Sequence, residues 1–142
     1  MKLLFIHQNM PGQYRELVQW LAATDQHEIV FLTQRATPPK FAGVRTVQYK
    51  THHKAADDAY GLSKTWENAA GNGFAAAKAM QDLVASGFVP DIVIGHVGWG
   101  EMSFLREVLP HTPSIGFFEY FYSVPGGPVG FDPAAPPSDH AP

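Results

Sequence analysis

The sequence predicts an α/β fold, with a doubly wound, mostly parallel five-stranded sheet of strand order 3-2-1-4-5 and helices on both faces. Two observations lead to this prediction. Short, uninterrupted apolar runs alternate with segments in which apolar residues recur every three or four positions. The apolar runs lack polar alternation, which is typical of strands buried on both faces of a parallel sheet.

The elements can be placed in order along the chain. Strands are predicted at residues 3–6, 29–32, 44–47, 92–95 and 114–118. Helices are predicted at residues 12–23, 57–86 and 101–109, and Gly71-Asn72-Gly73 is expected to split the second of them or to kink it. Right-handed crossovers in this alternation place the first and fourth strands side by side. We therefore expect a Rossmann-like domain at residues 1–122 and a Pro/Gly-rich loop or truncated linker at 123–142.

Composition limits the partners of the chain. The net charge is -3, and the ten Lys and Arg are scattered, which disfavours nucleic acid or an anionic membrane as the main partner. The absence of Cys removes disulfides, thiolate metal sites and a Cys nucleophile. The apolar run at the N-terminus is too short for a signal peptide. We expect a cytoplasmic protein, with a peripheral position at the inner membrane face left open.

Polar and aromatic residues gather just beyond the ends of the predicted strands. In an open parallel sheet, ligands bind at the carboxyl ends of the strands, near the point where the strand order reverses. This rule selects residues after the first, fourth and fifth strands, namely Asn9, Gly12, Gln13, His96, Trp99 and Glu119. We therefore predict a small-molecule site at this edge of the sheet.

The turn before the first helix reads Asn9-Met10-Pro11-Gly12-Gln13. Gly12 allows the backbone to approach a ligand closely, and the N–H groups of the following helix favour a phosphate or a sugar hydroxyl. The turn lacks the three glycines of the dinucleotide fingerprint, so an NAD or FAD enzyme is disfavoured. The alternative is that Pro11-Gly12 merely makes a tight turn.

Three glycines surround His96 and Trp99 after the fourth strand, in the segment Gly95-His96-Val97-Gly98-Trp99-Gly100-Glu101. His96 could bond a sugar hydroxyl and Trp99 could offer a flat apolar face, or both could simply be packed structural residues. Glu101 is expected to favour the N-terminus of the next helix. Glu119 lies among aromatic residues, which belong either to the core or to a face for a missing domain.

No metal site or cofactor is predicted. His52-His53 and Asp57-Asp58 lack the spacing of a metal-ligand motif, and no Walker loop, G-x-S-x-G or H-E-x-x-H sequence occurs.

Two segments resemble the N-terminal domain of glycosyltransferase family 4. They are residues 5–14 and, more specifically, residues 90–101, and the similarity continues through 116–122 and 130–133. The resemblance implies a GT-B enzyme with two facing Rossmann-like domains. The first mainly holds the acceptor and the second holds the nucleotide-sugar donor, and transfer retains anomeric configuration without a metal or any cofactor besides this co-substrate.

The resemblance also implies roles for individual residues. Gly12 is expected near the donor diphosphate, and His96 is expected to contact the transferred sugar as the catalytic residue. Strand-end geometry adds Asn9, Gln13, Trp99 and Glu119 as substrate-binding residues.

The 142 residues stop before a C-terminal donor-binding domain, so we expect this chain alone to be inactive. The alternatives are a stand-alone sugar- or nucleotide-binding module, a protein-interaction domain and a different nucleotide-dependent enzyme. Self-association is expected through an aromatic face that comprises Phe117, Phe118, Tyr120, Phe121 and Tyr122.

Overall fold

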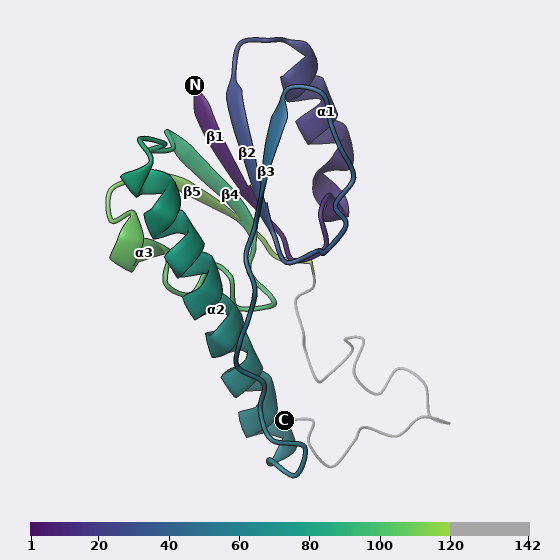
Figure 1. The fold of residues 1–142 in the computed structure, drawn as a ribbon, viewed down its shortest axis with the longest axis vertical. Coiled ribbons are helices and arrows are strands. Elements are labelled where there is room, and N and C mark those ends of the chain that lie inside the picture. The colour runs from purple at the N-terminus through teal and green to yellow at the C-terminus, as the bar shows by residue number, and fades with distance from the viewer. Residues whose placement is uncertain (120–142) are drawn as a thin grey trace, which may run out of the picture.

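The structure is a computed structural model that describes residues 1–119, the side chain of Leu62 excepted. The described residues form one five-stranded parallel sheet with the order β3-β2-β1-β4-β5, which confirms the predicted topology (Figure 1). The strands are β1 (Lys2–Ile6), β2 (Glu28–Thr33), β3 (Val44–Gln48), β4 (Ile92–His96) and β5 (Ser114–Phe117). All of their carboxyl ends therefore lie along the same edge of the sheet.

The central strands are buried on both faces because helices cover both. Successive side chains of a strand point to opposite faces, so β1 divides its apolar residues between two cores. Leu4 and Ile6 belong to one core, whereas Leu3 and Phe5 belong to the other. The ring of Phe5 stacks on that of Phe31, its partner in the β1–β2 register, with centroids 5.9 Å apart.

Each core is completed by different helices. The 3-10 turn η1 (Gly12–Tyr14) and helix α1 (Arg15–Ala23) cover one face with Tyr14 and Val18. Helices α2 (Gly61–Ala85) and α3 (Leu105–Val108) cover the other face. Figure 1 shows this arrangement, with the first half of α2 extending beyond the carboxyl edge of the sheet.

Helix α2 is continuous, so the predicted split at Gly71-Asn72-Gly73 is wrong. Glycine in a helix costs about 1 kcal/mol relative to alanine, but here it permits close packing. A Cβ on Gly73 would lie 2.7 Å from the carbonyl oxygen of Gly100. The glycines thus let another segment approach the helix and do not end it.

The helix predicted at residues 101–109 is shorter in the structure, where α3 comprises only Leu105–Val108. Residues 101–104 form turns instead. The first predicted helix likewise begins as the 3-10 turn η1. The predicted segment at 123–142 lies outside the described residues. Within the described part of the chain, no helix combines the length and the apolar character needed to span a membrane.

Candidate functional site

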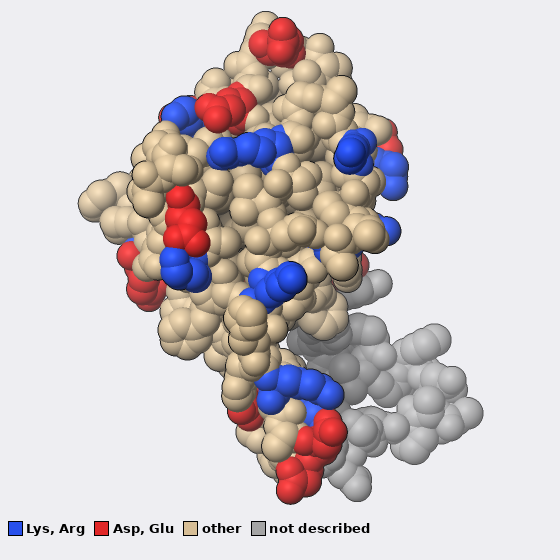
Figure 2. Space-filling model, viewed as in Figure 1, with Lys and Arg blue, Asp and Glu red and all other residues tan. Residues whose placement is uncertain are grey.

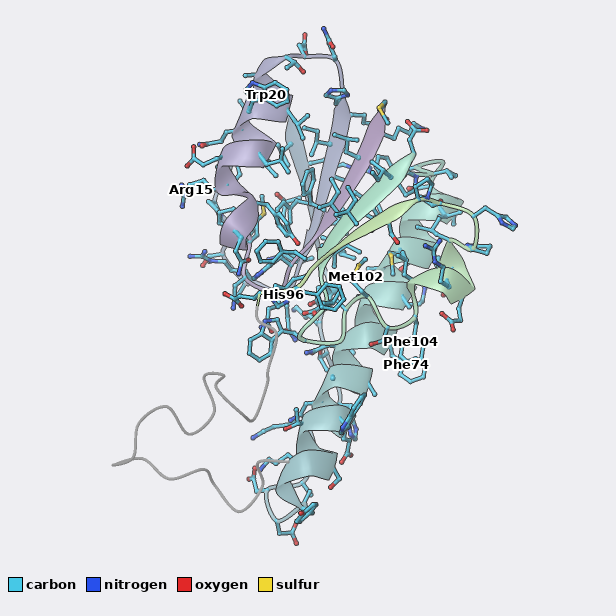
Figure 3. The ribbon with its side chains drawn as sticks, turned by 180° about the vertical axis from the view of Figure 1, so that it is seen from behind. Arg15, Trp20, Phe74, His96, Met102 and Phe104 are labelled. Carbon is cyan, nitrogen blue, oxygen red and sulfur yellow. The ribbon has the colours of Figure 1, made fainter. Side chains whose placement is uncertain are left out.

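Two histidines meet where the central strands end. His7 directly follows β1 and His96 is the last residue of β4, and these two strands are neighbours in the sheet. Both side chains are buried, and their ring centroids lie 5.3 Å apart. Figure 3 shows His96 where the strands converge at the carboxyl edge.

Backbone hydrogen bonds define the tautomer of both rings. The N–H of Asn9 donates to His7 Nδ1 at 2.9 Å, and the N–H of Gly98 donates to His96 Nδ1 at 3.1 Å. A ring nitrogen that accepts a hydrogen bond carries no proton, so in each neutral ring the proton resides on Nε2. Burial, with a smaller contribution from the neighbouring His96, lowers the pKa of His7 and favours its neutral form. The pair therefore presents two Nε2–H donors.

Gly12 brings the turn against His7. Its φ of +53° lies in the left-handed region, and its N–H donates to the carbonyl of Asn9 at 2.9 Å. A Cβ at this position would lie 2.6 Å from His7 Nε2. Because the Gly12 N–H is occupied within the turn, this residue can serve a ligand through close backbone approach rather than as a donor. Asn9 contributes to the site through its main chain.

Glu119 connects three strand ends. Gln13 Nε2 donates to Glu119 Oε1 at 3.1 Å, and His96 Nε2 lies 3.4 Å from Glu119 Oε2. The carboxylate is solvent-accessible, so these contacts stabilise the fold by no more than about 1 kcal/mol. A ligand hydroxyl could replace the carboxylate as the partner of His96 at small cost.

Trp99 supplies an aromatic surface beside His96. Its ring is nearly parallel to the imidazole, with centroids 6.2 Å apart and an interplanar angle of 19°. The side chain is 49% exposed, so part of the indole remains open to solvent. The ring of Phe117 also lies near His96, with its centroid 6.1 Å from that of the imidazole. The predicted residues Gly12, Gln13, His96, Trp99 and Glu119 are thus brought together, but the roles assigned to them stay predictions.

Sequence reasoning missed two features of this edge. His7 was not among the residues selected, although it directly follows the first predicted strand, and this position beside the fourth strand could have identified it. Glu101 does not begin a helix but is only 1% exposed, and its Oε1 accepts a hydrogen bond from the Tyr49 hydroxyl at 2.8 Å. Burial raises the pKa of Glu101. The two partners are 52 positions apart, and no local pattern indicates their contact.

A separate groove lies away from these residues. It has a volume of about 640 Å³ and runs between α2 and the segment after β3, and Tyr49, His53, Gly71 and Phe74 are among its lining residues. None of the predicted site residues lines it. Its face of the molecule carries interspersed positive and negative side chains without a patch of one sign (Figure 2). Among residues 1–119, no group of three or more His, Asp or Glu is arranged to hold a metal ion.

Comparisons with known proteins show what the chain is similar to. A family model described as the glycosyl transferase family 4 group matches residues 25–142. Two solved structures of Os79 variants from O. sativa, each in complex with UDP, are similar in fold, with a TM-score of 0.56 for both. The first is 16% identical and the alignment covers 83% of this chain and 29% of that one. The second is 15% identical, with 83% and 28% covered.

The chain thus spans less than a third of the length of either solved chain. At these identities the likeness concerns the fold alone. No curated protein sequence matches the chain.

Proposed function

The chain belongs to the glycosyl transferase family 4 group, and from this premise we propose that it is the N-terminal, acceptor-side domain of a retaining glycosyltransferase that uses a nucleotide-sugar donor. The catalytic partner in this proposal is a second domain that faces the carboxyl edge of the sheet and holds most of the donor. The UDP in both similar solved structures supports a uridine diphosphate sugar as the first donor to test.

The observation that carries the proposal is the pair of Nε2–H donors at the point where the strand order reverses. His7 and His96 lie at the ends of adjacent strands, directly after β1 and as the last residue of β4, and each ring is held in the tautomer that donates from Nε2. A sugar presents hydroxyl oxygens that accept such bonds. Burial of the rings makes the bonds stronger than they would be in water.

The residues of the site have distinct roles in this proposal. His96 Nε2–H binds a hydroxyl of the transferred sugar and orients it, and Trp99 covers an apolar face of a sugar ring. The donor diphosphate is placed beside the turn at Gly12, which packs directly against the His7 ring because it lacks a Cβ. Gln13 and Glu119 contact the sugar or the acceptor once a ligand displaces the carboxylate from His96.

The test is an NMR titration of the 15N-labelled chain with UDP and with UDP-glucose. NMR is suited to it because one domain alone supplies few contacts, so that binding is expected to be weak. We expect dissociation constants near or above the millimolar range, where a Kd of about 1 mM corresponds to a binding free energy of about -4 kcal/mol. Shifts should occur at the amides of Asn9, Gly12, Gln13 and Trp99. His96→Ala should weaken UDP-glucose binding more than UDP binding, since the donated hydrogen bond goes to the sugar.

His111→Ala is the matched control, because this exposed histidine lies before β5 at the opposite edge of the sheet. It should leave both titrations unchanged. Shifts confined to the groove beside α2, or equal losses for UDP and UDP-glucose in His96→Ala, would contradict the proposal. Transfer activity is then tested on a protein that includes a second domain, by mass spectrometry of the products. If that protein binds the sugar but transfers none, a non-catalytic binding module is favoured.

A further inference from the structure

The loop that carries Trp99 is tied to α2 by one side chain. Asn72 Nδ2 donates to the carbonyl oxygen of Trp99 at 2.9 Å. Asn72 Oδ1 accepts a hydrogen bond from the Thr51 hydroxyl, also at 2.9 Å. The same hydroxyl accepts from Gln34 Nε2 at 2.8 Å. These bonds form a continuous relay from the end of β2, through the segment after β3 and α2, to the loop after β4.

All three hydrogen bonds run from donor to acceptor in the same direction along the relay. Each donor faces an acceptor from Gln34 through Thr51 and Asn72 to Trp99, so the amide orientation of Asn72 satisfies both neighbours at once. Consecutive hydrogen bonds of this kind strengthen one another. Rotating the Asn72 amide would place its Oδ1 against the Trp99 carbonyl oxygen, which can only accept, so the bond to Trp99 holds the side chain in one orientation.

Glycines on both sides of the contact let the loop reach Asn72. Gly100 has a φ of +99°, and a Cβ there would overlap the carbonyl of Ala69. A Cβ on Gly73 would in turn lie 2.7 Å from the carbonyl oxygen of Gly100. Loop and helix thus approach backbone to backbone, and the Asn72 side chain provides a hydrogen bond that crosses the contact.

The segment held by Asn72 carries two features of the candidate site. Gly98, directly before Trp99, donates the N–H that defines the His96 tautomer. Trp99 places its ring at 19° to the imidazole. Movement of the Trp99 main chain would therefore disturb the aromatic face and the orientation of the His96 donor together.

We propose that Asn72 is a positioning residue for sugar binding, which acts by holding the Trp99 main chain so that the indole and the His96 Nε2–H face one ligand. This inference rests on the proposed function, since it assigns the ligand of the edge to a nucleotide sugar. Asn72 itself touches no ligand in this arrangement. It contributes to affinity by holding the loop after β4 in its binding conformation before the ligand binds.

The deciding variant is Asn72→Asp, which has nearly the same shape, keeps the acceptor for Thr51 and loses the donor to Trp99. Hydrogen exchange at the amides of residues 98–103 should become faster, and the Trp99 indole resonance should move. The dissociation constant for UDP-glucose should rise about two- to tenfold, as expected for the loss of one hydrogen bond. Substitution of Trp20 and Trp66 by Phe assigns the indole resonance.

Asn68→Asp is the matched control, because Asn68 lies about one turn earlier on α2 and its Oδ1 accepts a hydrogen bond from the Ala55 N–H. This variant introduces the same charge into the same helix without touching the loop. It should leave loop exchange, the indole resonance and UDP-glucose affinity unchanged. If Asn72→Asp fails to fold, Thr51→Val removes the hydroxyl that holds Asn72 and should loosen the loop in the same way.

Three results would overturn the inference. The first is unchanged exchange and an unchanged indole resonance in Asn72→Asp. The second is faster exchange in the loop of Asn72→Asp with unchanged affinity for UDP-glucose, in an experiment where the wild type binds UDP-glucose at the strand ends. The third is a wild type that binds no nucleotide sugar there, which removes the proposed function as well. The titration of the wild type separates this third outcome from the other two.

Discussion

His7, directly after β1, and His96, the last residue of β4, make the same local hydrogen bond, in which each Nδ1 accepts the N–H of the residue two positions later. The β1–β4 register pairs Ile6 with Gly95, so the histidines follow the last matched pair on each strand. Their rings meet at 68° with centroids 5.3 Å apart. Because His7 is buried, its protonation would introduce a poorly solvated charge at the edge of the sheet.

The buried His7 should make stability depend on pH. Its pKa is lowered in the folded chain below the ordinary value of 6.5, so the unfolded chain binds the proton more readily. Stability from this group is therefore fully present above pH 6.5 and is lost as the pH falls toward the lowered folded pKa. Denaturant unfolding of wild type and His7→Gln across this window should show their stability difference narrowing on acidification. Parallel curves would contradict the assignment.

Gly12 should be sensitive to an added methyl group for two separable reasons. In Gly12→Ala the Cβ would crowd the His7 ring, and the φ of +53° would also be strained for alanine. We expect a loss of about 2 to 3 kcal/mol in the free energy of unfolding, together with altered His7 resonances.

Gly87→Ala separates these causes, since Gly87 has a φ of +90° but nothing within 4 Å of an added Cβ. Its cost should come from backbone strain alone, about 1 kcal/mol. Equal losses in the two variants would show that contact with His7 is unimportant.

The Tyr49–Glu101 pair should couple the segment after β3 to the loop after β4. Tyr49→Phe leaves the buried Glu101 without its side-chain donor and should lower the free energy of unfolding by about 1 to 3 kcal/mol. The double variant with Glu101→Leu, which removes the acceptor, should show a non-additive loss, measured as a double-mutant cycle. A coupling energy of zero would exclude a direct interaction.

Glu101 should also contribute a pH dependence of opposite sign to that of His7. Burial raises its folded pKa above the ordinary value of 4.5, so the folded chain binds this proton more readily than the unfolded chain. Stability from this group is present below pH 4.5 and is lost as the pH rises through the raised value. Glu101→Gln should therefore gain stability relative to wild type as the pH rises from 4.5 toward neutrality. A difference independent of pH would argue against a raised pKa.

The sheet could be predicted because burial on both faces requires continuous apolar strands, and parallel strands place their carboxyl ends along one edge. That rule alone brought His96, Gln13 and Glu119 into one region. It could not predict which of their atoms would pair, since the Gln13–Glu119 bond joins residues 106 positions apart.

Local reasoning was wrong where tertiary contact determines the structure. Glycines have low helix propensity, but Gly73 in α2 permits the close approach of Gly100, and Gly71 lies against Thr51 and His53. Glu101 was expected to favour a helix start, but it is buried against Tyr49 and the helix begins at Leu105. In both cases the determining partner lies far along the chain, beyond any periodic pattern.

The edge strand β5 should support self-association through aromatic residues. Phe118, directly after β5, is 76% exposed, and Ile115 and Phe117 on the strand are also exposed. The other aromatic residues expected on this face, Tyr120, Phe121 and Tyr122, lie outside the described residues. An apolar face on an edge strand is a common site of protein contact, because both its side chains and its unpaired backbone groups are available.

We therefore expect the weight-average mass to rise with concentration in sedimentation experiments, and Phe118→Ser to reduce this rise. Trp20→Ser is the matched control, because Trp20 is 66% exposed but lies on α1, away from the edge strand. It removes a large exposed ring without altering the face beside β5, and should therefore leave the association unchanged. A wild type that stays monomeric at the highest concentration, or equal effects of the two substitutions, would show that β5 is not the contact.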